Sequence, residues 1–183
     1  MIRHSVILTC YNGEKYILEA IDSVLKQISS DDELIIVDDG STDSSSAIVS
    51  NIKDDRIRIV ERHVNGGIAR ARNDAILLVR GKYVSFIDHD DYWGNGRMFD
   101  FERTVNQFPE TDVVHGFVAH FYSEPELANR FLLPETQLSV LPGTVTMSHD
   151  LVCKVGLFDV TLTCGEFIDF MSRARSLSVC WKS

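Results

Sequence analysis

Polar residues follow three apolar runs in the first half of the chain, and their types suit a cation and phosphate. Tyr11–Asn12 follow the run SVILTC, Asp38–Asp39 end the run ELIIVDD, and Asp88–Asp91 (DHDD) follow KYVSFI. Crowded carboxylates repel one another unless a cation or protons intervene. Mg²⁺ and Mn²⁺ prefer oxygen ligands and leave positions open for phosphate oxygens. The DHDD run therefore predicts a divalent-cation site.

The spacing within DHDD separates its side chains. In an extended segment alternate residues face opposite ways, so Asp88 and Asp90 are expected together and His89 away from them. His89 is therefore expected to pack against the protein rather than to bind a metal. Asp and Asn are also common turn and cap residues, so each cluster taken singly has an ordinary structural explanation.

Short strands alternate with helices along this part of the chain, which predicts an α/β fold with a mostly parallel sheet and helices on both faces. Ligands of such sheets bind outside the carboxyl ends of the strands, so the polar clusters should converge on one crevice. A first helix is expected from about Glu14, and a second from Thr42 or Asp43, which can cap it. The strand patterns cover residues 5–10, 33–39, 56–61 and 82–88. The buried stripe of the first helix is Ile17, Ala20, Ile21, Val24, Leu25 and Ile28.

Arg72 lies beside the apolar stripe of a third predicted helix, over residues 67–80, which Gly81 is expected to end. A guanidinium at this buried edge needs an anionic partner. A structural salt bridge to Asp38 or Asp39 is one explanation of such an arginine. The stripe consists of Ile68, Ala71, Ala75, Ile76 and Val79.

The pattern changes after Trp93. Residues 123–143 contain three of the four prolines together with several Leu and Phe residues, and are expected to form a loop over the sheet.

On the last helix Glu166 and Asp169 can share a face, so either carboxylate can serve as a base. Stabilisation of the helix amino end by Glu166 and pairing of Asp169 with Arg173 are the structural alternatives. The expected elements are helices over 97–108, 150–155 and 165–177 and strands over 112–122 and 143–148.

Composition excludes some classes of function. The 183-residue chain has a formal net charge of −9 and no stretch of basic and aromatic residues, so nucleic acid is a poor partner. No apolar run approaches the roughly 18 residues of a membrane span, and the short amino-terminal run is too brief for a secretory leader. We expect no transmembrane segment and a cytoplasmic protein. The four cysteines lack metal-finger spacing and are expected to be free and mostly buried.

Taken in order, SVILTCYNGEKYILEAIDSVLKQ, ELIIVDDGSTD and NGGIARARNDAILLVRGKYVSFIDHDD resemble the nucleotide-binding half of the inverting family-2 glycosyltransferases. The resemblance covers about the first half of the chain, and linked motifs in one order are far more specific than a lone acidic pair. It implies a single GT-A domain, a Rossmann-like nucleotide-diphospho-sugar transferase fold. Residues 1–95 would bind the nucleotide sugar and residues 96–183 would form the acceptor side.

The resemblance also implies roles for individual residues. Thr9 and Tyr11 would line the base pocket, the Tyr11 ring stacking on a uracil-like base, and Asp39 would bind the base edge. Asn12 and Asp38 belong to the same donor-binding set. Arg72 would reach the base or phosphates.

The metal side of the expected site comes from the DHDD run. Asp88 would hold the ribose side, and Asp90 would be the principal protein ligand of Mn²⁺ or Mg²⁺. Asp91 would support the metal site without binding the ion itself. The expected donor is a nucleotide-diphosphate sugar, UDP-linked.

The second half departs from the family. Relatives commonly have a Glu-Asp pair near the start of a late helix, whose Asp is the general base. Here Glu166 matches the Glu, but Phe167 stands where the Asp would be, which leaves Glu166 and Asp169 as the candidate bases. Glu166 is favoured of the two, because it lies at the start of the helix, nearest the expected crevice. The chain stops at SVCWKS, in a predicted strand, as a naturally short or a truncated member would.

The sequence is compatible with two functions and disfavours a third. The first is metal-assisted inverting transfer of a sugar to an acceptor hydroxyl of an unknown glycan, lipid or protein. The second is a catalytically inactive nucleotide-sugar-binding module of the same fold, which the missing Asp at Phe167 permits. The third, a nucleotidyltransferase, is disfavoured because no Gly-rich basic phosphate loop lies near the amino terminus.

Overall fold

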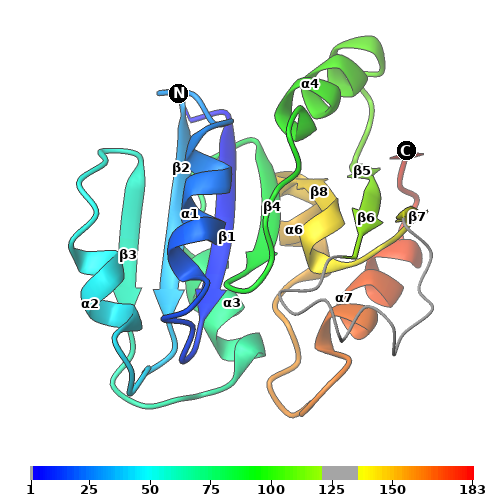
Figure 1. Ribbon diagram of the computed structural model, residues 1–183. Coiled ribbons are helices and arrows are strands. Elements are labelled where there is room, and N and C mark those ends of the chain that lie inside the picture. The colour runs from blue at the N-terminus through cyan, green and yellow to red at the C-terminus, as the bar shows by residue number, and fades with distance from the viewer. Residues whose placement is uncertain (1, 121–135) are drawn as a thin grey trace.

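A computed structural model describes residues 2–120 and 136–183 as an α/β structure around a central sheet (Figure 1). The described strands form a seven-stranded sheet in the order β3-β2-β1-β4-β8-β5-β9. Strands β1 to β4 are parallel to one another, as the alternating pattern predicted. Their bounds are β1 His4–Cys10, β2 Asp32–Asp38, β3 Ile57–Glu61 and β4 Tyr83–Asp88.

Helices cover both faces of this sheet, which confirms the predicted layers (Figure 1). Successive side chains of a strand point to opposite faces of the sheet. On one face they pack against α1 (Ile17–Leu25), α2 (Ser45–Ser50) and α4 (Arg97–Gln107). On the other face they pack against α3 (Ile68–Ile76), α6 (His149–Val155) and α7 (Glu166–Arg175).

The sheet changes direction beyond β4. Strand β8 (Val145–Ser148) runs antiparallel between β4 and β5 (Val113–His115), and β9 (Trp181–Lys182) is parallel to β5. A separate hairpin pairs β6 (Phe117–Ala119) with β7 (Thr136–Leu138). Because β8 is reversed, the turn Pro142–Thr144 that precedes it lies at the edge where β4 ends.

A row of buried hydrogen bonds joins β1, β4 and β8. His4 Nε2 lies 2.9 Å from Ser85 Oγ, which lies 2.5 Å from Thr146 Oγ1. Burial and the nearby Arg97 and Arg3 charges lower the pKa of His4 to about 3, so its ring is neutral in the folded protein. The row fixes the junction at which the sheet changes from parallel to antiparallel pairing.

Several predicted helix bounds were wrong at their ends. Helix α1 begins at Ile17 rather than near Glu14, because residues 14–16 form a turn. Helix α2 begins at Ser45, and α3 ends at Ile76, well before Gly81. The predicted strand over 112–122 is interrupted at Gly116, between β5 and β6. Most of the loop predicted over 123–143 lies outside the described residues.

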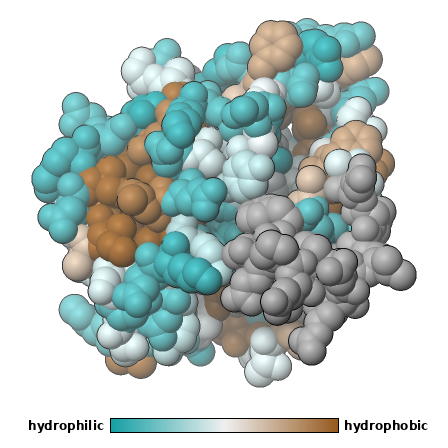
Figure 2. Space-filling view, in the orientation of Figure 1, coloured by the Kyte–Doolittle hydropathy of each residue, from teal (hydrophilic) through white to brown (hydrophobic). Residues whose placement is uncertain are grey.

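In Figure 2 a broad apolar area lies over β3, between α1 and α2, with polar residues around it. Helix α2 has only six residues, so it covers β3 incompletely and Ile59 remains 39% exposed. All four cysteines are free, as predicted, but the expectation that most are buried was wrong, because only Cys10 is. Across the part of the chain that is described, no helix is long and apolar enough to span a membrane.

Candidate functional site

The parallel register brings the predicted polar clusters to one edge of the sheet. Cys10 is paired with Asp38, and Thr9 is paired with Asp88, so the carboxyl ends of β1, β2 and β4 are level. Tyr11 follows at this edge with 42% of its surface exposed. The clusters therefore meet at one edge of the sheet, as predicted, and this edge is referred to below as the carboxyl edge.

Asn12 and Asp38 shape the loops at this edge. Asn12 has a φ of 52°, in the left-handed region that Asn tolerates better than most residues, and its Oδ1 accepts the Thr42 backbone N–H at 2.8 Å. The buried Asp38 carboxylate accepts hydrogen bonds from the hydroxyl and backbone of Ser41. The Asn12 backbone N–H donates to Ser41 Oγ at 2.9 Å. The two residues thus tie the loop after β1 to the loop after β2.

Asp39 is buried and holds the turn before α3. Its two carboxylate oxygens accept the backbone N–H groups of Gly66 at 2.9 Å and Gly67 at 2.8 Å. Arg62 adds an ion pair to Asp39 at 2.8 Å and a second one to Asp74. The carboxylate predicted to bind a base edge therefore also fixes the position of the loop that leads to Arg72.

Arg72 is buried between two carboxylates from distant parts of the chain. Its Nη2 lies 2.9 Å from Asp88 Oδ1, and its Nη1 lies 2.6 Å from Glu166 Oε1. The prediction that this guanidinium needs an anionic partner is confirmed, but the suggested partners, Asp38 and Asp39, were wrong. Asp38 ends β2 and Asp39 follows it, whereas α3 turns Arg72 toward the end of β4 and the start of α7. Thr9 Oγ1 also donates to Asp88 Oδ1, at 3.3 Å.

The first turn of α7 supplies both predicted bases, and both are engaged. Glu166 is only 9% exposed and pairs with Arg72. Asp169 pairs with Arg173 at 2.9 Å in a half-exposed i, i+4 ion pair, which confirms the structural alternative for that residue. Phe167 is buried, and its ring centroid lies 5.8 Å from the Arg72 guanidinium carbon. The aromatic residue in place of the family's Asp therefore forms part of the arginine's enclosure.

The DHDD run does not continue the strand. β4 ends at Asp88, and the Asp91 N–H donates to the Asp88 carbonyl at 3.1 Å, so residues 88–91 form a turn. The predicted alternation of Asp88, His89 and Asp90 on an extended segment was therefore wrong. Burial first, and then the charges of Asp88 and Asp90, raise the pKa of Asp91 to about 6.

His89 packs against the loop after β1, in keeping with the packing role predicted for it. A Cβ placed on Gly13 would lie 2.8 Å from His89 Cγ and 2.9 Å from Cys10 Sγ, so the absence of a side chain at Gly13 permits this contact. The Gly13 N–H donates to Ser45 Oγ at 2.8 Å. The close contact connects the end of β1 with the acidic turn.

The acidic turn has the donors that a hard cation prefers, since Asp88, Asp90 and Asp91 present carboxylate oxygens and Asp90 is exposed. The charges of Asp88 and Asp90 add to the effect of burial in raising the pKa of Asp91. In the described part of the chain, no three His, Cys, Asp or Glu side chains are grouped so that they could hold a metal ion.

Three contributors to this edge were not identified from sequence. Glu14 Oε2 accepts the Ser44 N–H at 2.9 Å, and Ser45 supports Gly13. Asn73 exchanges two hydrogen bonds with the Phe158 backbone, at 3.0 and 2.8 Å. These contacts join residues 30, 32 and 85 positions apart, too far along the chain for any local pattern to reveal.

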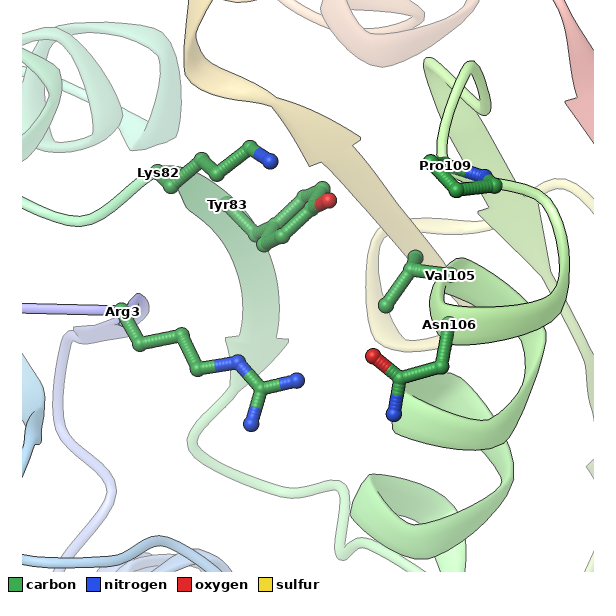
Figure 3. Close-up of a pocket in the computed structure, with 6 residues that line it drawn as sticks. All are labelled: Arg3, Lys82, Tyr83, Val105, Asn106 and Pro109. Atoms are coloured by element: carbon green, nitrogen blue, oxygen red, sulfur yellow. The ribbon is translucent and has the colours of Figure 1, made fainter.

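A cavity of about 310 Å³ lies at the opposite edge, where β1 and β4 begin (Figure 3). Arg3, Lys82 and Asn106 point toward it in that view. Because the predicted donor-binding residues follow the strands instead of preceding them, this cavity is separate from the candidate site. It is lined by Arg3, Lys82, Tyr83, Val105, Asn106 and Pro109.

Comparison with known protein families identifies the family of this chain. Residues 5–158 match the model of glycosyl transferase family 2. The chain belongs to this family. A UDP-Glc:alpha-D-GlcNAc-diphosphoundecaprenol beta-1,3-glucosyltransferase of Escherichia coli is 36% identical over 122 residues, 67% of this chain and 47% of that one. An uncharacterized glycosyltransferase of Bacillus subtilis is 46% identical over 90 residues, 48% of this chain and 26% of that one. The chain thus spans less than half the length of these two relatives.

Solved structures of other glycosyltransferases share the fold. The chain resembles S. aureus TarS in complex with UDP, with a TM-score of 0.77 at 24% identity, covering 99% of this chain and 58% of that one. It also resembles a mannosyltransferase of Pyrobaculum calidifontis in complex with GDP-Man and Mn²⁺, with a TM-score of 0.75 at 18% identity, covering 99% and 54%. This family-2 chain therefore has the predicted GT-A fold.

Proposed function

We propose that this family-2 chain binds a nucleotide-diphosphate sugar, UDP-linked, at the carboxyl edge and transfers the sugar to an acceptor hydroxyl with inversion. The observation that supports this most strongly is the convergence of Tyr11, Asp38, Asp39 and the acidic turn on one edge of the sheet. Open parallel sheets bind their ligands at this edge. The UDP complex of a protein with the same fold supports the choice of nucleotide.

Tyr11 and the loops after β1 and β2 supply the nucleotide side of the proposed site. The exposed Tyr11 ring can stack on the base, and aromatic stacking tolerates different bases. Asp39 fixes the Gly66–Gly67 turn through two N–H groups, so the loop beside the base is held in one arrangement. Asn12 and Asp38 hold the neighbouring loops together. These contacts prepare the edge before the nucleotide arrives.

The acidic turn supplies the phosphate side. Asp90, with support from Asp91, would hold Mn²⁺ or Mg²⁺ together with the diphosphate oxygens, and Asp88 would bind the ribose. A divalent ion at that place would stabilise the negative charge that develops on the departing diphosphate. The Mn²⁺ complex of the mannosyltransferase, a protein of the same fold, supports this choice of cofactor.

Transfer also needs a base for the acceptor hydroxyl, and the two carboxylates proposed for it differ in accessibility. Glu166 is nearly buried against Arg72. Asp169 lies in an ion pair whose side chains are 37% and 35% exposed, and exposed pairs of this kind contribute little free energy. Asp169 can therefore leave its partner at a lower free-energy cost than Glu166.

A second function, nucleotide-sugar binding without transfer, is favoured by one observation: both α7 carboxylates are in ion pairs, and Phe167 stands in place of the family's Asp. Measurements of nucleotide-sugar binding and of turnover distinguish the transferase from the binding module. A thermal-shift screen of UDP-, GDP- and TDP-sugars with and without Mn²⁺ tests binding, because a ligand of the folded state raises its melting temperature.

Turnover is then measured as release of nucleoside diphosphate from the stabilising sugar nucleotide. Slow Mn²⁺-dependent release favours the transferase. A clear thermal shift with no release, and no transfer to any acceptor offered, favours the binding module. No shift with any nucleotide sugar contradicts both.

A further inference from the structure

Arg72 is enclosed in a way that leaves it little room to touch a ligand. Its side chain is 2% exposed, and both terminal nitrogens are hydrogen-bonded, Nη1 to Glu166 and Nη2 to Asp88. The rings of Phe158 and Phe167 lie 5.6 and 5.8 Å from its guanidinium carbon. A guanidinium held by two carboxylates and two rings is fixed in orientation. It acts on its neighbours more readily than on a nucleotide.

Asp88 is the neighbour that reaches the carboxyl edge. Its Oδ1 accepts hydrogen bonds from Arg72 at 2.9 Å and from Thr9 at 3.3 Å. Among the described residues no hydrogen bond is made to Oδ2, and the side chain is 27% exposed. Two donors from different elements on one oxygen set the rotation of the carboxylate. The other oxygen is left for a ligand.

We propose that Glu166 and Arg72 are positioning residues, which orient Asp88 so that its Oδ2 accepts a hydrogen bond from the ribose of the nucleotide donor. The proposal rests on the proposed function, because it takes the carboxyl edge to be the nucleotide site. It gives Arg72 and Glu166 an indirect role in place of base or phosphate contact and proton acceptance.

The position of Glu166 explains why two carboxylates are needed. A guanidinium paired with Asp88 alone could rotate about that single contact, whereas a second pair on Nη1 fixes its plane. Glu166 is the first residue of α7, where the positive end of the helix dipole favours a negative side chain. The chain of ion pairs from Glu166 on α7 through Arg72 on α3 to Asp88 at the end of β4 is called the relay below. It joins the two halves of the chain at the site.

Titration of UDP in the presence of Mn²⁺, followed by calorimetry, tests the relay. Glu166→Gln keeps the shape of the side chain but removes its charge, and it is expected to weaken UDP binding roughly 10-fold or more, as loss of a residue that orients a ligand-binding carboxylate commonly does. Arg72→Lys is expected to have a similar effect. Both substitutions act through Asp88, so their effects should not add. The variant with both should bind UDP about as well as the single variant that binds it less well.

Glu33→Gln is the matched control. Glu33 is also buried and pairs with Arg80 at 2.6 Å and Arg58 at 3.1 Å, but it lies near the start of β2, away from the carboxyl edge. The Glu33→Gln substitution should lower the melting temperature and leave UDP affinity unchanged. Glu166→Asp, which keeps the charge, provides a second variant should Glu166→Gln fail to fold, and is expected to show an intermediate loss.

Each result decides a different point. Wild-type affinity in folded Glu166→Gln or Glu166→Asp would overturn the relay and leave the nucleotide site standing. An equal loss in Glu33→Gln would also overturn it, because the effect would then reflect general destabilisation. Failure of the wild-type protein to bind UDP, GDP or TDP would overturn the proposed function and the relay together.

Discussion

Replacement of Arg72 by Met tests whether the buried ion pairs also stabilise the fold. The substitution keeps most of the side-chain volume but leaves Glu166 and Asp88 without their cation. Glu166 is the more affected, because its side chain is 12% exposed whereas that of Asp88 is 27% exposed. An uncompensated buried carboxylate is far more costly than an exposed one, since water can no longer screen its charge.

The expected loss of unfolding free energy is about 3–5 kcal/mol, the usual cost of removing one partner of a buried pair. Glu166→Gln in the same chain should restore part of it, because a neutral amide needs no counter-charge. The coupling between the two substitutions should therefore be about 0.5–3 kcal/mol. Lys26→Met removes an exposed ion pair, with side chains 70% and 55% exposed, and should stay within about 0.5 kcal/mol of wild type.

Guanidinium chloride unfolding without nucleotide, followed by circular dichroism, measures these changes, and an unchanged slope of free energy against denaturant shows that the same surface is exposed in each variant. A loss below about 1 kcal/mol in Arg72→Met would show that the pairs contribute little. Purely additive losses in the double variant would show that Arg72 and Glu166 do not act on each other.

Three further predictions concern other parts of the molecule. Asp90→Ala should abolish the Mn²⁺-dependent part of UDP binding and leave the melting temperature unchanged; calorimetric affinity equal to wild type with Mn²⁺ present would contradict the metal assignment. Tyr11→Ala should weaken UDP binding by about 1–3 kcal/mol, and Tyr11→Phe hardly at all, if the ring stacks on the base; equal losses in titrations of both would point to the hydroxyl. The pKa of His4 falls from 6.5 when unfolded to about 3 when folded, so its contribution to stability is present above pH 6.5 and is lost as the pH falls toward 3. His4→Gln should therefore lose less unfolding free energy than wild type between pH 7 and pH 4 in urea titrations, and an identical loss would show that His4 does not govern this range.

The first half of the fold could be predicted because its signals are local. The apolar runs that became β1, β2, β3 and β4, and the stripe of α1, follow directly from side-chain periodicity. The need of Arg72 for an anion followed in the same way, from its place on a helix. Its partners could not be predicted, because Glu166 is 94 residues away and only the packing of α7 brings it there.

The errors also have physical causes. Helix α3 ends at Ile76 although Leu78 and Val79 continue the apolar pattern, because these residues pack on the core from a turn. The alternation assumed for the acidic run failed because β4 ends at Asp88. Periodicity identifies a buried face, but it does not say where the backbone hydrogen bonds of an element stop.

The register between β5 and β8 has a consequence for how such a protein can diversify. His115 is paired with Val145, so the intervening segment leaves the sheet and returns to it at the same place. Its last turn lies against the acidic run, since a Cβ on Gly143 would lie 3.2 Å from Asp91 Oδ2. Because the sheet fixes both ends of the segment at one place, insertions or replacements between His115 and Val145 can change the surface beside the acidic turn while strands β1 to β4 keep their positions.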